Sequence, residues 1–290
     1  MNKEKIAILV DSCADVPKEM IQKYGMYIIP LSIIYKDAVY ADGIDITSKE
    51  VYDNFNVEIP HTSLPSGGTI LNIFERIVSD GYEKVLVITI SGNLSGTYNF
   101  IRLLGDDFEG LDVFAVDTKS VALGSGMTAI LAAENLEKGF SWEELKKTTI
   151  ESISKIKIFF CVPSLKYLHK GGRIGLASSI IGESLNIKPI ISCNEDGILY
   201  SDVKIRGWKN SLEKMIELTE QYFFSISPSP QSYNIAIAHG NAYDEAAIVK
   251  EKFVEKFRGH HAIYEGLVSP VISVHAGPGV IGVGVQVLTQ

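Results

Sequence analysis

Short apolar runs alternate with amphipathic stretches through the first half of the chain. The runs are rich in branched and aromatic residues and are bounded by Gly, Asp or Ser, which is typical of buried strands. They predict strands at residues 6–10, 27–35, 85–90, 113–116 and 156–162.

The stretches between these runs have helical spacing. Two of them open with a capping box, from Thr47 to Glu50 and from Ser141 to Glu144. Strands that alternate with helices indicate an α/β domain with a mainly parallel sheet. The predicted helices are residues 16–24, 49–56, 69–79, 97–104, 128–137 and 142–154.

The second half has a different pattern, with early glycines and then strands that are not separated by helices in a regular way. We expect an α+β domain there, because 290 residues is close to the size at which one core splits into two. The predicted domains are an N-terminal α/β sandwich, residues 1–158, and a C-terminal α+β domain, residues 159–290. The predicted strands are 189–192, 198–204, 235–239, 262–266 and 280–288, and the predicted helices are 210–224 and 244–257.

Composition narrows the possible functions. The net charge of −8 disfavours binding to nucleic acid or to acidic membrane surfaces. Cys13, Cys161 and Cys193 are far apart and lack metal-site spacing, so we expect reduced thiols rather than disulfides or a zinc site. The apolar runs are shorter than the roughly 20 residues of a membrane helix, and the first is too short for a signal peptide. These features predict a soluble, cytoplasmic protein.

Polar loops follow several predicted strands, where ligands bind in open α/β sheets. Asp11, Ser12 and Asp15 are suited to a metal or a metal-bound phosphate, or else to a turn and a helix cap. Segment 62–66 has three hydroxyls at a helix start, suited to an anion or to an N-cap. Both alternatives remain open for both loops.

Segment 91–97 is a Gly/Ser/Thr loop that leads into a helix, so its N–H groups are suited to an anion. It lacks the lysine of a P-loop, and Asn93 stands where a nucleophile elbow has glycine. Near the C-terminus, His275 precedes Gly277-Pro278-Gly279 and is either an anion donor or a structural histidine. Segment 170–175 reads as a basic loop or an exposed turn.

Together these segments resemble the DegV family of bacterial lipid-binding proteins, and the resemblance covers essentially the whole chain. It implies two α/β domains with a long-chain fatty acid between them. It also implies a fatty-acid-binding subunit of bacterial fatty acid kinase, without cofactor or catalysis of its own. The kinase subunit phosphorylates the bound carboxylate, and the acyl phosphate then enters phospholipid synthesis. The resemblance rests on segments 11–15, 62–66, 91–98, 171–174 and 185–190, on Arg206 and on 275–279.

The resemblance also implies roles for individual residues. Those expected near the carboxylate lie in the polar loops, whereas two arginines are expected to face the kinase. The carboxylate residues are Thr62, Ser95, His275, Ser91 and Gly96, and the kinase-facing residues are Arg206 and Arg173.

Two positions depart from the family pattern, because Gly92 and Ala276 stand where hydroxyl residues are common. The three head-group loops contain no Lys or Arg, so a neutral, polar head-group site is expected. A palmitate-sized chain would gain about 0.8 kcal/mol per buried CH₂. Ile180, Ile181 and Leu185 are candidates for the tunnel wall or for ordinary core packing.

Two other functions compete with lipid carriage. Ser95 and His275 are the nucleophile and base of a possible serine hydrolase or acyltransferase, although no third, orienting acid can be assigned. Segment 91–97 is a possible phosphate or nucleotide site, although it has neither a P-loop lysine nor a complete GxGxxG fingerprint.

Overall fold

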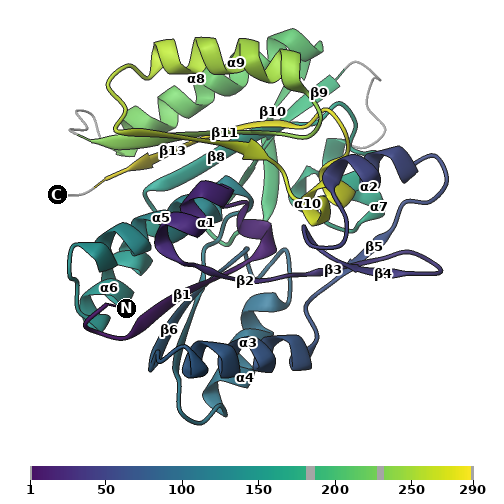
Figure 1. Ribbon diagram of the computed structural model, residues 1–290. Coiled ribbons are helices and arrows are strands. Elements are labelled where there is room, and N and C mark those ends of the chain that lie inside the picture. Colours follow the sequence, from purple (N-terminus) through teal and green to yellow (C-terminus); the bar gives the residue numbers. More distant parts are fainter. Residues whose placement is uncertain (1, 181–186, 227–231, 289–290) are drawn as a thin grey trace.

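The computed structural model describes residues 2–180, 187–226 and 232–288, which form two large sheets with helices between and outside them and a small three-stranded sheet (Figure 1). The layers run from α8 and α9, across a six-stranded sheet, to a layer of helices that includes α5, then to a four-stranded sheet, and end at α3 and α4. Among the described residues, no helix combines the length and the apolar composition that a membrane span requires.

The four-stranded sheet is entirely parallel, as the sequence predicted. Every residue of its strand β1 is buried, because helices cover both faces of the sheet. Ile8 and Val10 face the core between the two sheets, whereas Ala7 and Leu9 face α3 and α4. The strand order is β2 (Tyr27–Ile29), β1 (Ile6–Asp11), β6 (Lys84–Thr89) and β7 (Asp112–Asp117).

Three helices of this half, α2, α3 and α6, begin at a side-chain cap. Thr47 and Ser141 form the two predicted capping boxes, and the Ser66 hydroxyl accepts from the Thr69 N–H at the start of α3. The helices are α1 (Lys18–Tyr24), α2 (Ser48–Asn54), α3 (Gly67–Ser79), α4 (Thr97–Asp106), α5 (Leu123–Glu137) and α6 (Trp142–Ile153).

The six-stranded sheet is antiparallel except where β11 and β12 pair in parallel. Helices α8 (Trp208–Ile226) and α9 (Tyr243–Lys256) cover its outer face. The predicted fold class, a parallel α/β region followed by an α+β region, is confirmed. The strand order is β10 (Leu199–Arg206), β9 (Ile187–Cys193), β8 (Ile156–Cys161), β13 (Ile281–Val287), β11 (Tyr233–His239) and β12 (Ala262–Leu267).

The two halves share a hydrophobic core. Ile88 of β6 belongs to the same buried cluster as Ile158 of β8 and Ala236 of β11. The predicted boundary between residues 158 and 159 lies within β8, all of whose pairing is to the six-stranded sheet. The division into domains stays a prediction, and one face of each sheet contributes to the shared core.

Several short elements occupy segments that the sequence indicated as loops or as one longer strand. The predicted strand 27–35 is divided, and its second part is the middle of a three-stranded sheet, β4 (Val39–Ala41), β3 (Ser32–Ile34) and β5 (His61–Ser63). The basic segment 170–175 continues from helix α7 (Lys166–Lys170), and His275 lies on helix α10 (Pro270–Ala276). The short strands and α7 have three to five residues, which is too few for a hydrophobic pattern to repeat clearly.

Candidate ligand-binding site

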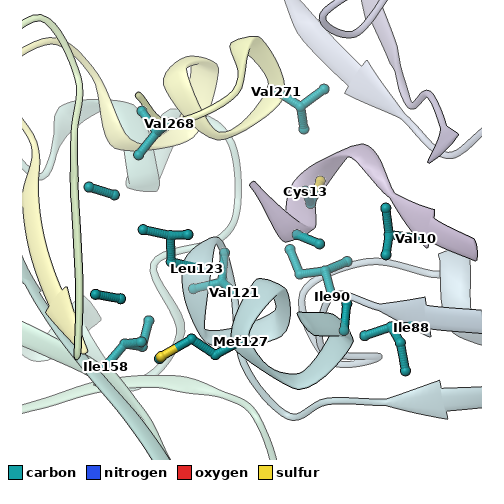
Figure 2. Close-up of a cluster of buried hydrophobic side chains, with 14 of the residues drawn as sticks. Val10, Cys13, Ile88, Ile90, Val121, Leu123, Met127, Ile158, Val268 and Val271 are labelled. Carbon is teal, nitrogen blue, oxygen red and sulfur yellow. The ribbon is translucent and has the colours of Figure 1, made fainter. Parts of the chain in front are cut away.

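A cavity of about 240 Å³ lies in the core between the two sheets. A single buried water needs roughly 10–15 Å³ by the same measure, so the space greatly exceeds one solvent molecule. Figure 2 shows part of its apolar surroundings, with Leu123 of α5 between Ile158 and Val268, and with Val271 and Cys13 on another side. Most of the lining side chains are hydrophobic.

The polar lining groups include Thr62, Ser63, Ser95, Arg173 and His275. The chain brings them together from β5, from the loop before α4, from the segment after α7 and from α10. Near these polar groups the cavity borders the surface, because the lining residue Leu64 is 37% exposed. Ala236, which lines the apolar part of the cavity, is only 1% exposed. The cavity therefore has a polar mouth and a closed apolar interior.

His275 and Thr62 are in direct contact, with 2.8 Å between His275 Nε2 and Thr62 Oγ1. The other ring nitrogen, Nδ1, is buried and has no hydrogen-bond partner among the described residues. A Cβ atom at Gly171 would lie 2.1 Å from this nitrogen, so glycine at this position makes room for the imidazole. Burial, helped by the positive charge of Arg173, lowers the pKa of His275 to about 4.

Ser95 and Gly96, which were predicted to bind the carboxylate, also line the cavity. The Ser95 hydroxyl is 2.8 Å from Thr97 Oγ1, at the start of α4. Ser91 is oriented differently, because its buried hydroxyl donates to the Gly197 carbonyl oxygen at 2.9 Å. It joins the two halves of the molecule and is not among the residues that line the cavity.

Arg173 lies at the cavity, which corrects the expectation of a head-group site without a cation. Its Nε donates to the Leu94 carbonyl at 3.2 Å, and Nη1 donates to the Gly171 carbonyl at 2.8 Å. These bonds hold the guanidinium beside the loop that carries Ser95 and beside Gly171, which lies against His275. Arg206, expected to face a partner, is exposed at the end of β10 and does not line the cavity.

Gly92 and Ala276, the two positions that depart from the family pattern, have different surroundings. A Cβ atom at Gly92 would be 2.9 Å from Asp117 Oδ2, and the Gly92 N–H donates to Asp117 Oδ1 at 3.0 Å. Any larger residue at this position would require Asp117 to move. Ala276 lines the cavity, so its methyl group contributes apolar surface beside His275.

Buried carboxylates from the first half hold the start of α10. Asp15 Oδ1 accepts from the Ser269 N–H at 3.0 Å, and Asp42 Oδ1 accepts from the Val271 N–H at 3.0 Å. Asp11 accepts from the Cys13 and Ile90 N–H groups, as the turn-forming alternative predicted. Burial raises the pKa of Asp11 to about 7 and that of Asp42 to about 6. The described residues contain no group of His, Cys, Asp and Glu arranged to hold a metal.

The geometry required of a serine hydrolase is not formed by these residues. His275 Nε2 contacts Thr62, whereas the Ser95 hydroxyl contacts Thr97. His275 Nδ1 contacts no carboxylate, among the described residues, that would orient the ring. A histidine with a pKa near 4 is also a weak general base at neutral pH.

Sequence reasoning missed most of the apolar lining. Ile181 and Leu185, two of the suggested tunnel residues, lie outside the described residues, as does the side chain of Ile180. The structure places Ala236, Ala238, Gly282 and Gly284 at the cavity instead. Small residues that alternate within a strand mark close approach of another group, and this signal was present in the sequence.

The chain is similar along its whole length to known sequences and solved folds. Residues 5–287 match the family described as "Uncharacterised protein, DegV family". A DegV domain-containing protein of Clostridium acetobutylicum is 40% identical over 97% of this chain and 98% of its own. A fatty-acid-binding DegV family protein of Thermus thermophilus has a TM-score of 0.91 and 26% identity, over 99% of this chain and all of its own. A stearic acid-binding protein of Eubacterium ventriosum has a TM-score of 0.86 and 26% identity, over 97% of this chain and 98% of its own.

Proposed function

Because this chain belongs to the DegV family, we propose that it binds one long-chain fatty acid in the cavity between its sheets. The observation that carries the proposal is the shape of that cavity, which is apolar within and polar at one end. A fatty acid has the same division between its carboxylate and its alkyl chain. The fatty-acid-binding proteins of similar structure support this choice of ligand.

The polar groups at the mouth suit a carboxylate. A buried carboxylate is costly unless it is hydrogen-bonded, and Thr62, Ser95 and His275 offer donors at this end. Arg173 supplies a positive charge nearby, and charge-assisted hydrogen bonds are stronger than neutral ones. The alkyl chain then occupies the apolar interior, where each buried CH₂ contributes about 0.8 kcal/mol.

The finer part of the proposal concerns a partner. The protein presents the carboxylate of its bound fatty acid to a fatty acid kinase, and the resulting acyl phosphate is used in phospholipid synthesis. The polar end lies where Leu64 is partly exposed, so a second protein can approach the carboxylate without entering the core. Arg206, exposed on the same half of the molecule as Arg173, is proposed to contact the kinase.

The protein is a carrier in this proposal and performs no catalysis itself. The separate contacts of Ser95 and His275 favour this role over the hydrolase alternative, because an activated serine needs the histidine within hydrogen-bond reach. The carrier also needs no cofactor, since the kinase supplies the chemistry.

Mass spectrometry of the purified protein, native and then after solvent extraction, tests the proposal. We expect one unmodified fatty acid per chain. A second experiment compares the Kd of a fatty acid with that of its methyl ester in Thr62→Val, Ser95→Ala and wild type. The variants should weaken binding of the acid by about tenfold and of the ester much less, because each lost hydrogen bond to a charged group costs about 1.5–3 kcal/mol.

The matched control is Ser91→Ala, which removes a hydroxyl of the same segment that faces Gly197 rather than the cavity. It should bind acid and ester as the wild type does. A protein that carries no lipid and binds none when fatty acids are added would refute the proposed function. Equal losses for acid and ester would remove Thr62 and Ser95 from the head-group site.

A further inference from the structure

The interior of the cavity is built on rows of residues that face each other across three neighbouring strands. Gly282 of β13 is opposite Phe160 of β8 and Ala238 of β11. Two residues deeper along β13, Gly284 is opposite Ile158 and Ala236. All six residues line the cavity. We call these the outer row and the inner row.

The small residues in these rows create the space. Ala236 and Ala238 belong to the core between the sheets, whereas Ile235 and Ile237, which alternate with them on β11, face α8 and α9. A strand presents alternate residues to opposite faces, so large residues fill one side of β11 and small ones leave room on the other. A Cβ atom added at Gly284 would lie 3.1 Å from both Ile158 Cγ2 and Met127 Cε. The tip of Met127 thus covers the inner row.

The third row is polar and closes the interior. Gln286 is opposite Asn234, and the Asn234 Nδ2 donates to Gln286 Oε1 at 2.9 Å. Gln286 Nε2 in turn donates to the Met127 carbonyl at 3.1 Å. Both amide side chains are 1% exposed, and neither lines the cavity. An alkyl chain that passed this row would break buried hydrogen bonds, each of which is expensive to leave unmade.

We infer that the inner row, Ile158, Gly284 and Ala236, sets the longest acyl chain that this protein accepts, with the Asn234–Gln286 amide pair as the wall behind it. The inference rests on the proposed function and adds the determinant of its chain-length preference. The polar mouth fixes the position of the carboxylate, so the distance to the inner row limits the chain. A chain that is too long has to leave methylene groups in water or displace the wall.

The test is a set of Kd values for saturated fatty acids of about 10 to about 20 carbons. In Ala236→Leu the added side chain fills the inner row, so the longest chains held by the wild type should bind at least about tenfold more weakly, while short chains bind unchanged. Ala236→Val fills less of the row and should give a smaller change in the same direction. Met127→Ala removes the side chain above Gly284 and should extend the limit to longer chains.

The matched control is Ile237→Val, on the same strand but facing α8 and α9, which should leave the length limit unchanged. Unaltered binding of short chains shows that a variant is folded with an intact head-group site. If Ala236→Leu and Ala236→Val keep the wild-type length limit, the inference is wrong although the proposed function stands. If the wild type binds no fatty acid of any length, the proposed function itself has failed.

Discussion

At the scale of single residues, several residues that line the cavity could be predicted from the sequence. Thr62, Ser95, Gly96 and His275 were singled out from polar segments of the sequence, and all four line one cavity. Ser91 belongs to the same loop as Ser95, but its hydroxyl faces Gly197, a residue 106 positions away. The sequence contains no signal for that contact, because it depends on how the two sheets are packed together.

Arg173, which was predicted to face a partner, also lines the cavity. Its position depends on carbonyl groups of Leu94 and Gly171, which come from separate segments. Backbone acceptors are present at every residue, so no sequence pattern indicates which of them an arginine will meet.

The buried carboxyl group of Asp42 should make the free energy of unfolding depend on pH. Burial raises its pKa to about 6 from an ordinary value of 3.8, so between these values the folded protein binds more protons than the unfolded chain. The stability contribution of this group is therefore fully present below pH 3.8 and is lost as the pH rises through 6. Asp42→Asn lacks the titrating group, so its unfolding free energy should improve relative to wild type by roughly 2–3 kcal/mol between about pH 4 and pH 8.

Urea titrations across this pH range measure the difference. Asp37→Asn, at an exposed position in the turn between β3 and β4, is the control and should follow the wild-type profile. Parallel profiles for Asp42→Asn and wild type would mean that burial does not raise the pKa of Asp42.

At the scale of elements, segments with several helical repeats, a complete buried apolar run or a helix cap were predictable. Helix α3 and strands β1 and β6 agree with the predicted pattern, and the seven-residue α2 was predicted from its capping box, whereas β4, β5, α7 and α10 were not predicted. Helix α10 has seven residues and is fixed from outside, by Asp15 and Asp42 at its N-terminus. The local sequence offers only the Ser269 cap and Pro270 as signals of this helix, and it does not reveal the two carboxylates, which lie more than 200 residues away along the chain.

Because α7 and α10 are in contact, we expect the substitution Gly171→Ala to weaken binding of the fatty acid head group. The backbone at Gly171 has φ −78°, which alanine adopts readily, so the chain should fold. The new Cβ would lie 2.1 Å from His275 Nδ1 and has to displace the imidazole. We expect the Kd of a fatty acid to rise by at least about tenfold, with a melting temperature within a few degrees of wild type.

The neighbouring position offers a control for this experiment. Gly172 has φ +70°, and a Cβ atom at this position would have no other atom within 4 Å. Gly172→Asn should therefore preserve binding, since asparagine tolerates this backbone region. Calorimetric titration of both variants distinguishes displacement of His275 from a general effect of changing the loop. Wild-type affinity in Gly171→Ala would show that the imidazole position is unimportant for the head group.

At the scale of the whole molecule, the cavity lies in the core that joins the two sheets. A ligand that fills it adds contacts to both halves at once, and binding to the folded state alone raises stability by RT ln(1 + [L]/Kd). Removal of the proposed ligand should therefore lower the melting temperature, by roughly 7 °C if free ligand was about 1,000 times Kd. Scanning calorimetry before and after delipidation, followed by addition of fatty acid, measures the loss and its recovery.

One cooperative transition is expected in both states, because the shared core couples the sheets. Two transitions that separate after delipidation would indicate that the ligand, rather than side-chain packing, holds the halves together. A melting temperature that is insensitive to fatty acid would contradict binding in the shared core.

The position of β13 has a consequence for how the protein is made. This strand follows every other strand of its sheet in the chain, yet it lies between β8 and β11. During synthesis, β8–β10 and β11–β12 emerge first as two fragments whose inner edges stay open until β13 inserts between them. Gly282 and Gly284 arrive with that strand, so the cavity does not exist on a nascent chain that lacks it. A ribosome-bound intermediate would thus carry two unprotected strand edges that are open to aggregation, and the proposed ligand can bind in the cavity only after β13 has inserted.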